Sequence, residues 1–174
     1  DGWKLDDDNI SALRAAGNAR LEIPVQIFKN AFRTTGKTIE FEFATHDVLD
    51  YDSVIISCLS GGRGIQVSAN EVSLKSAQST ISTRYKENEH VRISFVVEKR
   101  SENRLIYCYI NGVMSRVVQY PTSDDFSQQT PVNISIGSND CAIDLYCIRI
   151  YENDLTRVQV LNNWIADCQD VDEM

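Results

Sequence analysis

The chain lacks a long apolar run and a basic patch, and these two absences exclude several classes of protein. Its longest apolar stretches are a few residues, whereas a helix needs about 20 apolar residues to span a bilayer. The formal net charge is -8 at pH 7, and no stripe of Lys and Arg offsets it. Nucleic-acid backbones and anionic membranes would therefore repel the chain overall. We expect neither membrane insertion nor nucleic-acid binding.

Histidine is nearly absent, and the cysteines match no metal or disulfide pattern. The two histidines, His46 and His90, adjoin no motif that implies a nearby Ser or Cys nucleophile, so we interpret both as loop or strand-edge residues. The five cysteines are odd in number and lack zinc spacing. Three of them, Cys58, Cys108 and Cys147, lie in apolar strands, where a reduced cysteine acts as a small hydrophobic residue.

An alternation of strands and helices is also missing, as are internal repeats, and strand signals dominate instead. The segment 38–44 alternates Ile39, Phe41 and Phe43 with Glu40 and Glu42, which predicts a half-buried antiparallel strand with both glutamates on its wet face. About ten ranges have alternating or β-branched residues of this kind: 19–24, 38–44, 53–59, 65–68, 72–74, 91–98, 104–110, 113–120, 132–136 and 143–151.

The segment from Ala142 to Asp167 combines a strand with a capped helix. Both faces of 143–151 are largely apolar, which predicts a central strand or a bulge that switches its faces. Thr156 and Gln159 have the spacing of a capping box, and Leu155 and Val160 that of a hydrophobic staple. The helix then presents one apolar stripe, which includes a tryptophan that we expect in the core: Val160, Leu161, Trp164 and Ile165.

These elements predict an all-β protein, a two-sheet antiparallel jelly-roll sandwich with one short C-terminal helix. We expect residues 1–174 to form a single domain, cut from a longer protein, that needs no disulfide or metal to fold. No signal-peptide pattern is present. The Gly61-Gly62-Arg63-Gly64 segment lies between two strands rather than before a helix, so it predicts a hairpin turn and not a phosphate-binding loop.

Four motifs give the chain a resemblance to a known superfamily: 38–43, 104–112, 134–137, and 143–151 followed by Leu155-Thr156 and the helix. Together they resemble the concanavalin A-like lectins and glucanases, in particular the laminin-G-like jelly-roll domains, over about residues 12–167. The resemblance implies a non-catalytic module that binds glycans or proteins within a larger bacterial surface or bacteriophage tail protein. We therefore expect a non-enzymatic recognition module in a phage virion or on a bacterial cell. Its expected partners are a glycan or a host-surface protein, and other domains of the same protein. The alternative is a purely structural virion module.

Enzymes of this fold, the laminarinase-like glycosidases, supply a second alternative. They carry two catalytic carboxylates about 5–5.5 Å apart on one strand, in the pattern Glu-x-Asp-x-x-Glu. The nearest match is Glu40-Phe41-Glu42, but Thr45 stands at the third carboxylate position. We therefore expect no hydrolase activity.

The Asn111-Gly112 pair is a strong hairpin signal and predicts the faces of the two strands beside it. A two-residue turn places Tyr109 opposite Met114 and Tyr107 opposite Arg116. One face should then join the core: Ile106, Cys108, Ile110, Val113, Ser115 and Val117. The other face carries our candidate ligand-binding residues, Tyr107, Tyr109, Met114 and Arg116, because recognition surfaces favour Tyr, Met and Arg. The alternative is that the helix or a neighbouring domain covers this face.

Aspartates in two loops form a candidate calcium site. Counting successive antiparallel strands places 46–52 and 121–131 at one end of the sandwich, together with Lys99 and Arg100. Some laminin-G-like domains hold calcium at such a rim, and calcium prefers six to eight oxygen ligands. A solvated acidic rim is the other interpretation, and we expect no further cofactor. The aspartates are Asp47, Asp50, Asp52, Asp124 and Asp125.

Overall fold

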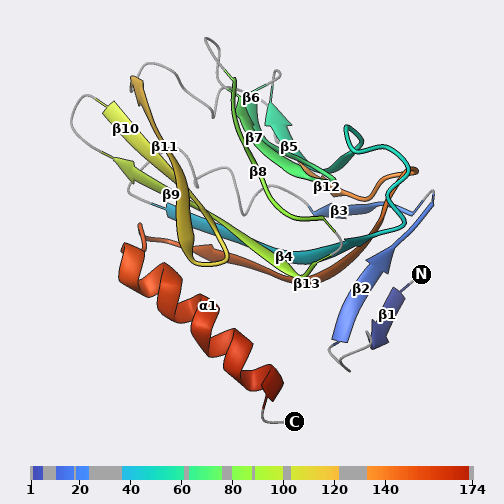
Figure 1. The fold of residues 1–174 in the computed structure, drawn as a ribbon. Coiled ribbons are helices and arrows are strands. Elements are labelled where there is room, and N and C mark those ends of the chain that lie inside the picture. Colours follow the sequence, from blue (N-terminus) through green and yellow to red (C-terminus); the bar gives the residue numbers. More distant parts are fainter. Residues whose placement is uncertain are drawn as a thin grey trace.

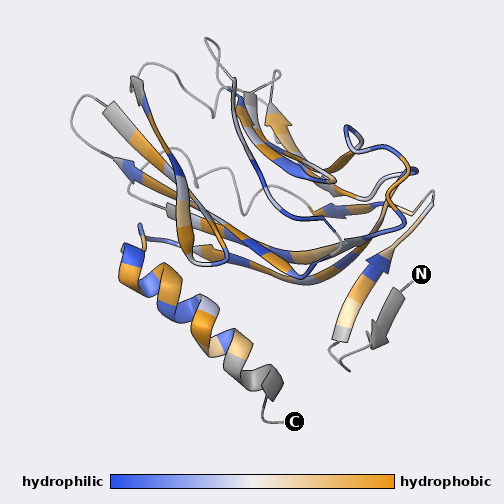
Figure 2. Cartoon of the chain, in the orientation of Figure 1, coloured by the Kyte–Doolittle hydropathy of each residue, from blue (hydrophilic) through white to orange (hydrophobic). Residues whose placement is uncertain are grey.

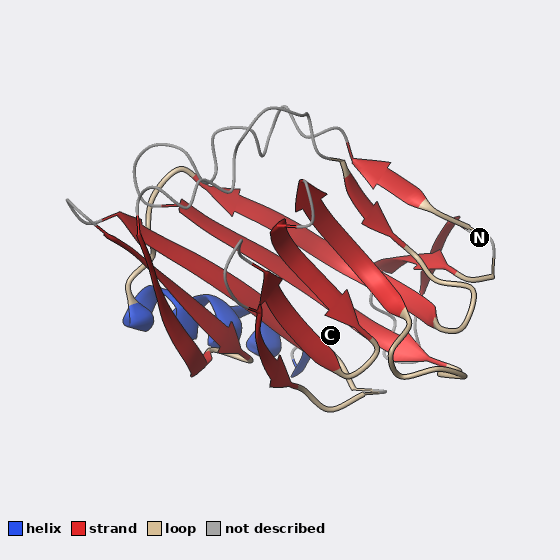
Figure 3. Ribbon diagram, turned by 90° about the horizontal axis from the view of Figure 1, so that it is seen from above, coloured by secondary structure: helices blue, strands red, loops and turns tan. Residues whose placement is uncertain are grey.

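Two antiparallel β-sheets stack face to face, and a single helix lies against the outside of one of them (Figures 1 and 3). The computed structural model describes residues 2–5, 11–17, 19–23, 37–60, 63–75, 80–87, 89–99, 103–121 and 133–172. The predicted all-β sandwich with a C-terminal helix is confirmed. Within the described residues, no helix combines the length and the apolar character needed to cross a membrane.

The larger sheet has seven strands, in the order β1-β2-β13-β4-β9-β10-β11. The strand that enters last, β13, lies between β2 and β4 and is therefore central, as its two apolar faces predict. Helix α1 (Arg157–Asp172) crosses the outer face of this sheet. The strands are β1 (Gly2–Leu5), β2 (Ser11–Ala15), β4 (Lys37–His46), β9 (Val91–Lys99), β10 (Asn103–Ile110), β11 (Val113–Pro121) and β13 (Ala142–Tyr151).

The smaller sheet has six strands, in the order β3-β12-β5-β6-β7-β8. Ser60 pairs with Arg63 across β5 and β6, as expected for the predicted hairpin, although Gly61 and Gly62 themselves lie outside the described residues. The strands are β3 (Leu21–Ile23), β5 (Val54–Ser60), β6 (Arg63–Ser68), β7 (Glu71–Lys75), β8 (Thr80–Arg84) and β12 (Ile134–Ile136).

The core lies between the sheets and follows the predicted alternation. Ile39 pairs with Phe95, and Phe41 with Ile93, so that β4 and β9 present one continuous apolar surface. All four side chains are at most 1% exposed. Burial of each such side chain stabilises the fold by about 1.5–3 kcal/mol. Figure 2 shows the resulting alternation of hydrophobic and hydrophilic residues along the strands.

A bulge at Tyr146 reverses the faces of β13. Leu145 pairs with Phe43 and Cys147 with Glu42, so Tyr146 has no partner on β4. Leu145 therefore packs in the core before the bulge, whereas Ile148 packs against the core after it. The predicted change of parity is confirmed, and it turns the side chains of the following odd-numbered residues to the outer face of the sheet.

Strands β1, β2 and β8 were not predicted, and the omission of β8 made the loop count wrong. Because the additional strand β8 lies between β7 and β9, every later strand runs in the direction opposite to the one predicted. Lys99 therefore lies near Arg104, at the opposite end of the sandwich from His46. Strand β11 also ends at that opposite end, because Pro121 pairs with Asn103.

Candidate functional site

The outer face of the seven-stranded sheet is polar, and helix α1 covers it. Glu40 and Glu42 point to this face, as predicted, but they are only 1% and 7% exposed. The prediction that they form a wet surface is therefore wrong. Alternation in β4 identifies which side chains share a face, but it does not reveal that a helix from the end of the chain packs over that face.

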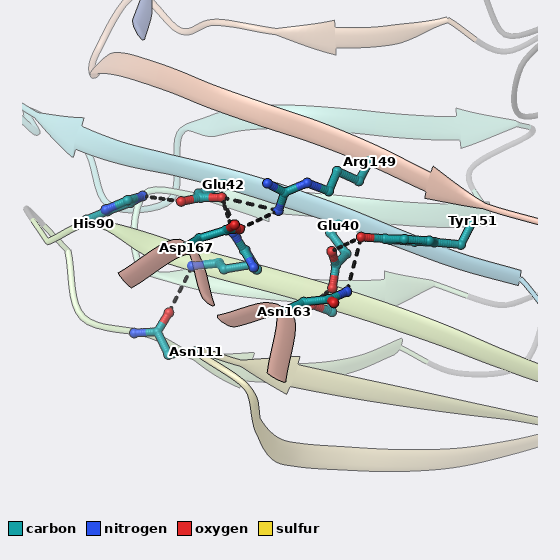
Figure 4. Close-up of polar contacts among 10 residues, drawn as sticks. Glu40, Glu42, His90, Asn111, Arg149, Tyr151, Asn163 and Asp167 are labelled. Carbon is teal, nitrogen blue, oxygen red and sulfur yellow. Dashed lines mark hydrogen bonds and ion pairs between the residues drawn. The ribbon is translucent and has the colours of Figure 1, made fainter. Parts of the chain in front are cut away.

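Charged groups from three strands and the helix form a partly buried ionic network around Arg92, and several of its members are labelled in Figure 4. The Arg92 side chain is fully buried; its guanidinium contacts Asp167 and donates from Nε to Glu42 Oε2 at 3.2 Å. Arg149 Nη1 donates to Asp167 Oδ2 at 2.6 Å. His90 Nε2 lies 2.8 Å from Glu42 Oε1. Asp167 thus links α1 to both arginines.

The network sets the protonation of the Glu42 carboxyl. Burial alone would raise its pKa, because a charged group is poorly solvated beneath the helix. The hydrogen bond and charge of His90 and of Arg92 outweigh burial and hold the pKa below its usual value. Glu42 is therefore a carboxylate that stabilises its positive neighbours, and its oxygens are already bonded within the protein.

Glu40 is held in a second group of polar contacts further along the helix. Ser94 Oγ donates to Glu40 Oε1 at 2.9 Å, and the Tyr151 hydroxyl donates to Glu40 Oε2 at 3.1 Å. Asn163 Nδ2 of α1 donates to the Tyr151 oxygen at 3.1 Å. Helix and sheet are therefore joined by hydrogen bonds as well as by ion pairs.

Helix α1 contacts the sheet with a different face from the predicted one. Val160 is fully buried, as expected, but Leu161 is 38% and Ile165 is 42% exposed. Trp164 is only half-buried, and its ring lies against Arg92 (5.7 Å from the guanidinium carbon to the ring centroid) rather than in the sandwich core. The face that meets the sheet has helical spacing but is partly polar: Val160, Asn163, Trp164 and Asp167.

The N-terminus of α1 has the predicted cap. Gln159 N–H donates to Thr156 Oγ1 at 3.3 Å, and Thr156 N–H donates to Gln159 Oε1 at 2.8 Å. Leu155 and Val160, the predicted staple, pack with Val96 in a small apolar cluster on the outer face of the sheet. This cluster fixes the helix over β9 and β10.

A bulge at Ser115 changes the predicted register of the β10–β11 hairpin. Tyr109 pairs with Met114, as predicted, but Cys108 pairs with Arg116 and Tyr107 with Val117. The predicted pairing of Tyr107 with Arg116 is therefore wrong. Arg116 shares the inner face with Cys108 and lies beside Val118 at the opening between the sheets.

The same bulge alters the predicted core face of the hairpin. Ile106 and Cys108 are buried, but Val113 is 62% and Val117 is 51% exposed, and Ser115 is also exposed. Ser115 shares a hydrogen bond of 2.6 Å with Thr83 of β8, which joins the edges of the two sheets. An extra residue in one strand turns every later side chain to the opposite face, so the predicted faces are reversed after Ser115, as at Val117. Val113 lies before the bulge and is exposed at the hairpin end of the edge strand β11.

Three of the four predicted binding residues, Tyr107, Tyr109 and Met114, lie together in a groove between the sheet and the segment 154–157 at the start of α1. The groove has a volume of about 390 Å³, which is within the range of small-ligand sites. We call it the α1 groove; its lining is Val96, Glu98, Tyr107, Tyr109, Met114, Asp154, Leu155, Thr156 and Arg157. Arg116 is not part of it, and Arg157 supplies a guanidinium there instead.

The two tyrosines have different roles in the α1 groove. Tyr109 is 3% exposed and packs under Leu155, so the helix covers most of this ring. Burial raises the pKa of its hydroxyl. Tyr107 is half-buried, with its ring centroid 6.5 Å from that of Tyr109 and its hydroxyl donating to Glu98 Oε2 at 2.7 Å. Tyr107 and Met114, which is 42% exposed, form the accessible floor.

The predicted calcium rim is only partly within the described residues. Asp47, Asp50 and Asp52 lie in the loop after β4, where Asp50 Oδ1 accepts a hydrogen bond from Asp52 N–H at 3.0 Å. Asp124 and Asp125 lie outside the described residues. In the described part of the chain, no three His, Cys, Asp or Glu side chains are grouped as a metal site. The segment that meets this loop is 137–141, since Leu49 N–H donates to the Asp140 carbonyl at 2.7 Å.

The histidines and cysteines occupy the expected elements, but several have polar contacts that the sequence did not indicate. His46 ends β4 and His90 precedes β9; His46 Nε2 lies 3.0 Å from Asp144 Oδ2, which Arg14 also contacts. Burial raises the pKa of both Cys58 and Cys108 to about 12. All five cysteines are unbridged, and Cys147 faces the ionic network rather than the core.

Comparison with known proteins gives similarity of fold only. No known protein family matches the chain, and no curated protein matches it. Among solved structures, a mutant of HCR/D has 9% sequence identity and a TM-score of 0.71, covering 96% of this chain and 45% of its own. The binding domain of botulinum neurotoxin DC in complex with SialylT has 14% identity and a TM-score of 0.68, covering 94% and 44%.

The same binding domain in complex with rat synaptotagmin II has 15% identity and a TM-score of 0.66, covering 94% of this chain and 45% of its own. This chain therefore spans less than half the length of each of these proteins. The similarity agrees with the observed β-sandwich. It does not transfer the glycan or the protein partner of the neurotoxin domains to this chain.

Proposed function

We propose that this domain is a non-enzymatic recognition module that binds carbohydrate in the α1 groove. The observation that carries the proposal is the juxtaposition of a half-buried tyrosine ring with hydrogen-bonding groups of both kinds in one groove. The Tyr107 ring offers a flat apolar surface for the C–H face of a sugar. Glu98 and Asp154 can accept hydrogen bonds from hydroxyl groups, and Arg157 can donate them.

The positions of the paired glutamates favour recognition over hydrolysis. A glycosidase needs two carboxyl groups that reach the substrate on either side of the scissile bond. Glu40 is 1% exposed and accepts hydrogen bonds from Ser94 and Tyr151, and Glu42 is engaged by Arg92 and His90. This pair would have to lose the helix and its internal partners before a sugar could approach.

The wider setting of the module follows from its resemblance to laminin-G-like and concanavalin A-like domains. We infer that it belongs to a larger protein of a phage tail or a bacterial surface, where its partners are a glycan on the host and neighbouring domains of the same protein. The comparison structures support recognition, because they are described as binding domains; the phage or bacterial setting rests on the resemblance alone.

Binding of the isolated domain to a glycan array tests the proposal, with Tyr107→Ala as the diagnostic variant. We expect wild-type binding and a loss of at least about tenfold in affinity when the stacking ring is removed. Tyr51→Ala is the matched control, because Tyr51 is 46% exposed in the loop at the other end of β4. A silent array, or equal loss in both variants, would contradict the proposal.

A structural or protein-binding module is the second candidate, and one surface favours it. The hairpin and the solvent side of α1 expose several apolar side chains: Val113, Met114, Val117, Val158, Leu161 and Ile165. Apolar patches of this kind are typical of protein contacts. Substitution of Val158 and Ile165 by Ser should leave glycan binding unchanged under our proposal, but should abolish assembly with neighbouring domains under the alternative.

A further inference from the structure

We infer that the α1 groove selects neutral glycans and discriminates against sialylated or otherwise anionic ones. This inference rests on the proposed carbohydrate-binding function and names the class of ligand. It depends on three features of the groove: its carboxylates, the state of the helix N-terminus beside it, and the placement of its guanidinium.

Two carboxylates border the accessible floor of the groove. Glu98 is half-buried, and its Oε2 accepts a hydrogen bond from the Tyr107 hydroxyl at 2.7 Å. The Glu98 carboxylate therefore lies beside the stacking ring. Asp154 is exposed in the segment just before the helix and also lines the groove. A sugar stacked on Tyr107 would lie in a groove that both carboxylates line. An anionic substituent there would meet like charges in a site partly shielded from water, where repulsion is stronger than in bulk solvent.

The helix N-terminus beside the groove is already capped by the protein. Free N–H groups at the start of a helix would attract an anion. Here the Thr156 hydroxyl accepts the N–H of Gln159, and the Gln159 amide oxygen accepts the N–H of Thr156. These two N–H groups are therefore not available to a ligand, and the helix N-terminus attracts an acidic sugar less strongly than an uncapped one would.

Arg157 is the one cation among the described residues that line the groove. Its charge acts on the Tyr109 hydroxyl, whose pKa it lowers against the stronger effect of burial. Among those described residues one guanidinium stands beside two carboxylates, in a chain of net charge -8. Donors and acceptors are instead mixed around an aromatic floor, an arrangement complementary to a ligand with many uncharged hydroxyl groups.

The test is binding of the isolated domain to paired glycans that differ only in a terminal sialic acid, such as N-acetyllactosamine with and without it. For pairs bound by the wild type, we expect at least about tenfold tighter binding of the neutral member. Since no ion pair with the ligand is needed, its affinity should change little between about 50 and about 300 mM NaCl, concentrations chosen to vary screening.

Two variants test whether residues of the α1 groove cause the preference for neutral glycans. Glu98→Gln with Asp154→Asn keeps the shape of the lining but removes both charges, so we expect the preference to fall to about threefold or less. Arg157→Gln should lower the affinity for the neutral glycan by about tenfold, because a charged hydrogen-bond donor is lost. Urea denaturation of each variant would show that the fold is retained.

The outcomes separate this inference from the proposed function. Preference for the sialylated member, or a preference for the neutral one that survives in the Glu98→Gln/Asp154→Asn variant, would overturn the inference while leaving carbohydrate binding intact. A lack of binding to every member of the panel would instead overturn the proposed function and the inference together.

Discussion

The guanidinium carbon of Arg92 on β9 lies 5.7 Å from the centroid of the Trp164 ring on helix α1. Arg92 also contacts Glu42 of β4 and Asp167 of α1. One buried side chain thus joins the sheet and the helix by ion pairs and by a cation–π contact. Arg157 of α1 and the three residues before it line the proposed binding groove, so the junction that holds α1 on the sheet also supports the groove.

Substitution of Arg92 by Met should destabilise the domain strongly. Met preserves much of the volume but leaves the buried Glu42 carboxylate without its main positive partner, a change that typically costs about 3–5 kcal/mol. Urea denaturation would measure the loss. Lys86→Met is the control, since Lys86 pairs with Glu89 at the surface, and exposed pairs contribute at most about 1 kcal/mol. Similar losses in the two variants would contradict a structural role for the network.

Acid should weaken the domain through the same network. The folded-state pKa of Glu42 is below its ordinary value of 4.5, because His90 and Arg92 outweigh the effect of burial. A carboxyl with a depressed pKa contributes stability that is present above the ordinary value and is lost as the pH falls through the folded value. The pKa of Asp144 is also lowered from 3.8, since Arg14 and His46 outweigh its burial.

We therefore expect these two carboxylates to contribute fully above about pH 5 and progressively less below it. Urea midpoints measured between about pH 7 and about pH 3 would show the decrease. Glu42→Gln should be less stable near neutral pH but should lose less further stability on acidification. An unchanged pH profile in this variant would show that Glu42 is not one of the responsible groups.

Alanine at Gly112 should destabilise the domain more than alanine at Gly17, because helix α1 packs directly against the hairpin turn. Gly112 has a φ of +72°, and a Cβ there would lie 3.1 Å from both Leu161 Cδ1 and Trp164 Cβ. Gly17 has a similar φ of +58°, but a Cβ there would have no neighbouring atom within 4 Å. Both substitutions incur backbone strain of about 1 kcal/mol, and only Gly112→Ala adds steric overlap with the helix. Equal losses of stability would contradict close packing of α1 on the turn.

Thiol labelling should distinguish the cysteines by their environment. Cys168 is exposed on α1, whereas Cys58 and Cys108 are buried with their pKa raised to about 12. At about pH 8 a thiol with that pKa is ionised to roughly one part in ten thousand, and the thiolate is the reactive form. We expect a fast reaction with a thiol reagent that Cys168→Ser removes. Rapid modification of Cys58 or Cys108 in the folded protein would contradict their burial.

The sheets could be predicted from sequence because alternation reports directly which side chains share a face. Ile39, Phe41 and Phe43 alternate with two glutamates in the sequence, and all three are buried in the core as that alternation predicts. The cap of α1 was also predictable, because Thr156 and Gln159 act through local hydrogen bonds. Features that depend on one strand or a short helix segment can therefore be predicted from the sequence.

The rest depended on contacts between distant segments. The Ser115 bulge has no signal in its own composition, yet it moves Arg116 away from Tyr107. Glu40 and Glu42 alternate in the same way whether water or a helix covers them, so their burial depends on the packing of α1. The apolar stripe did not predict the helix face, because the residues of α1 that contact the sheet include the polar Asn163 and Asp167.

We propose that ligand recognition occurs in the α1 groove, and amide NMR of the isotopically labelled domain would locate the bound ligand residue by residue. On addition of a neutral oligosaccharide identified on the glycan array, we expect the largest chemical-shift changes at Glu98, Tyr107, Met114 and Arg157. Changes centred instead on the loop after β4, near Tyr51, or at the opening between the sheets, near Arg116, would contradict it.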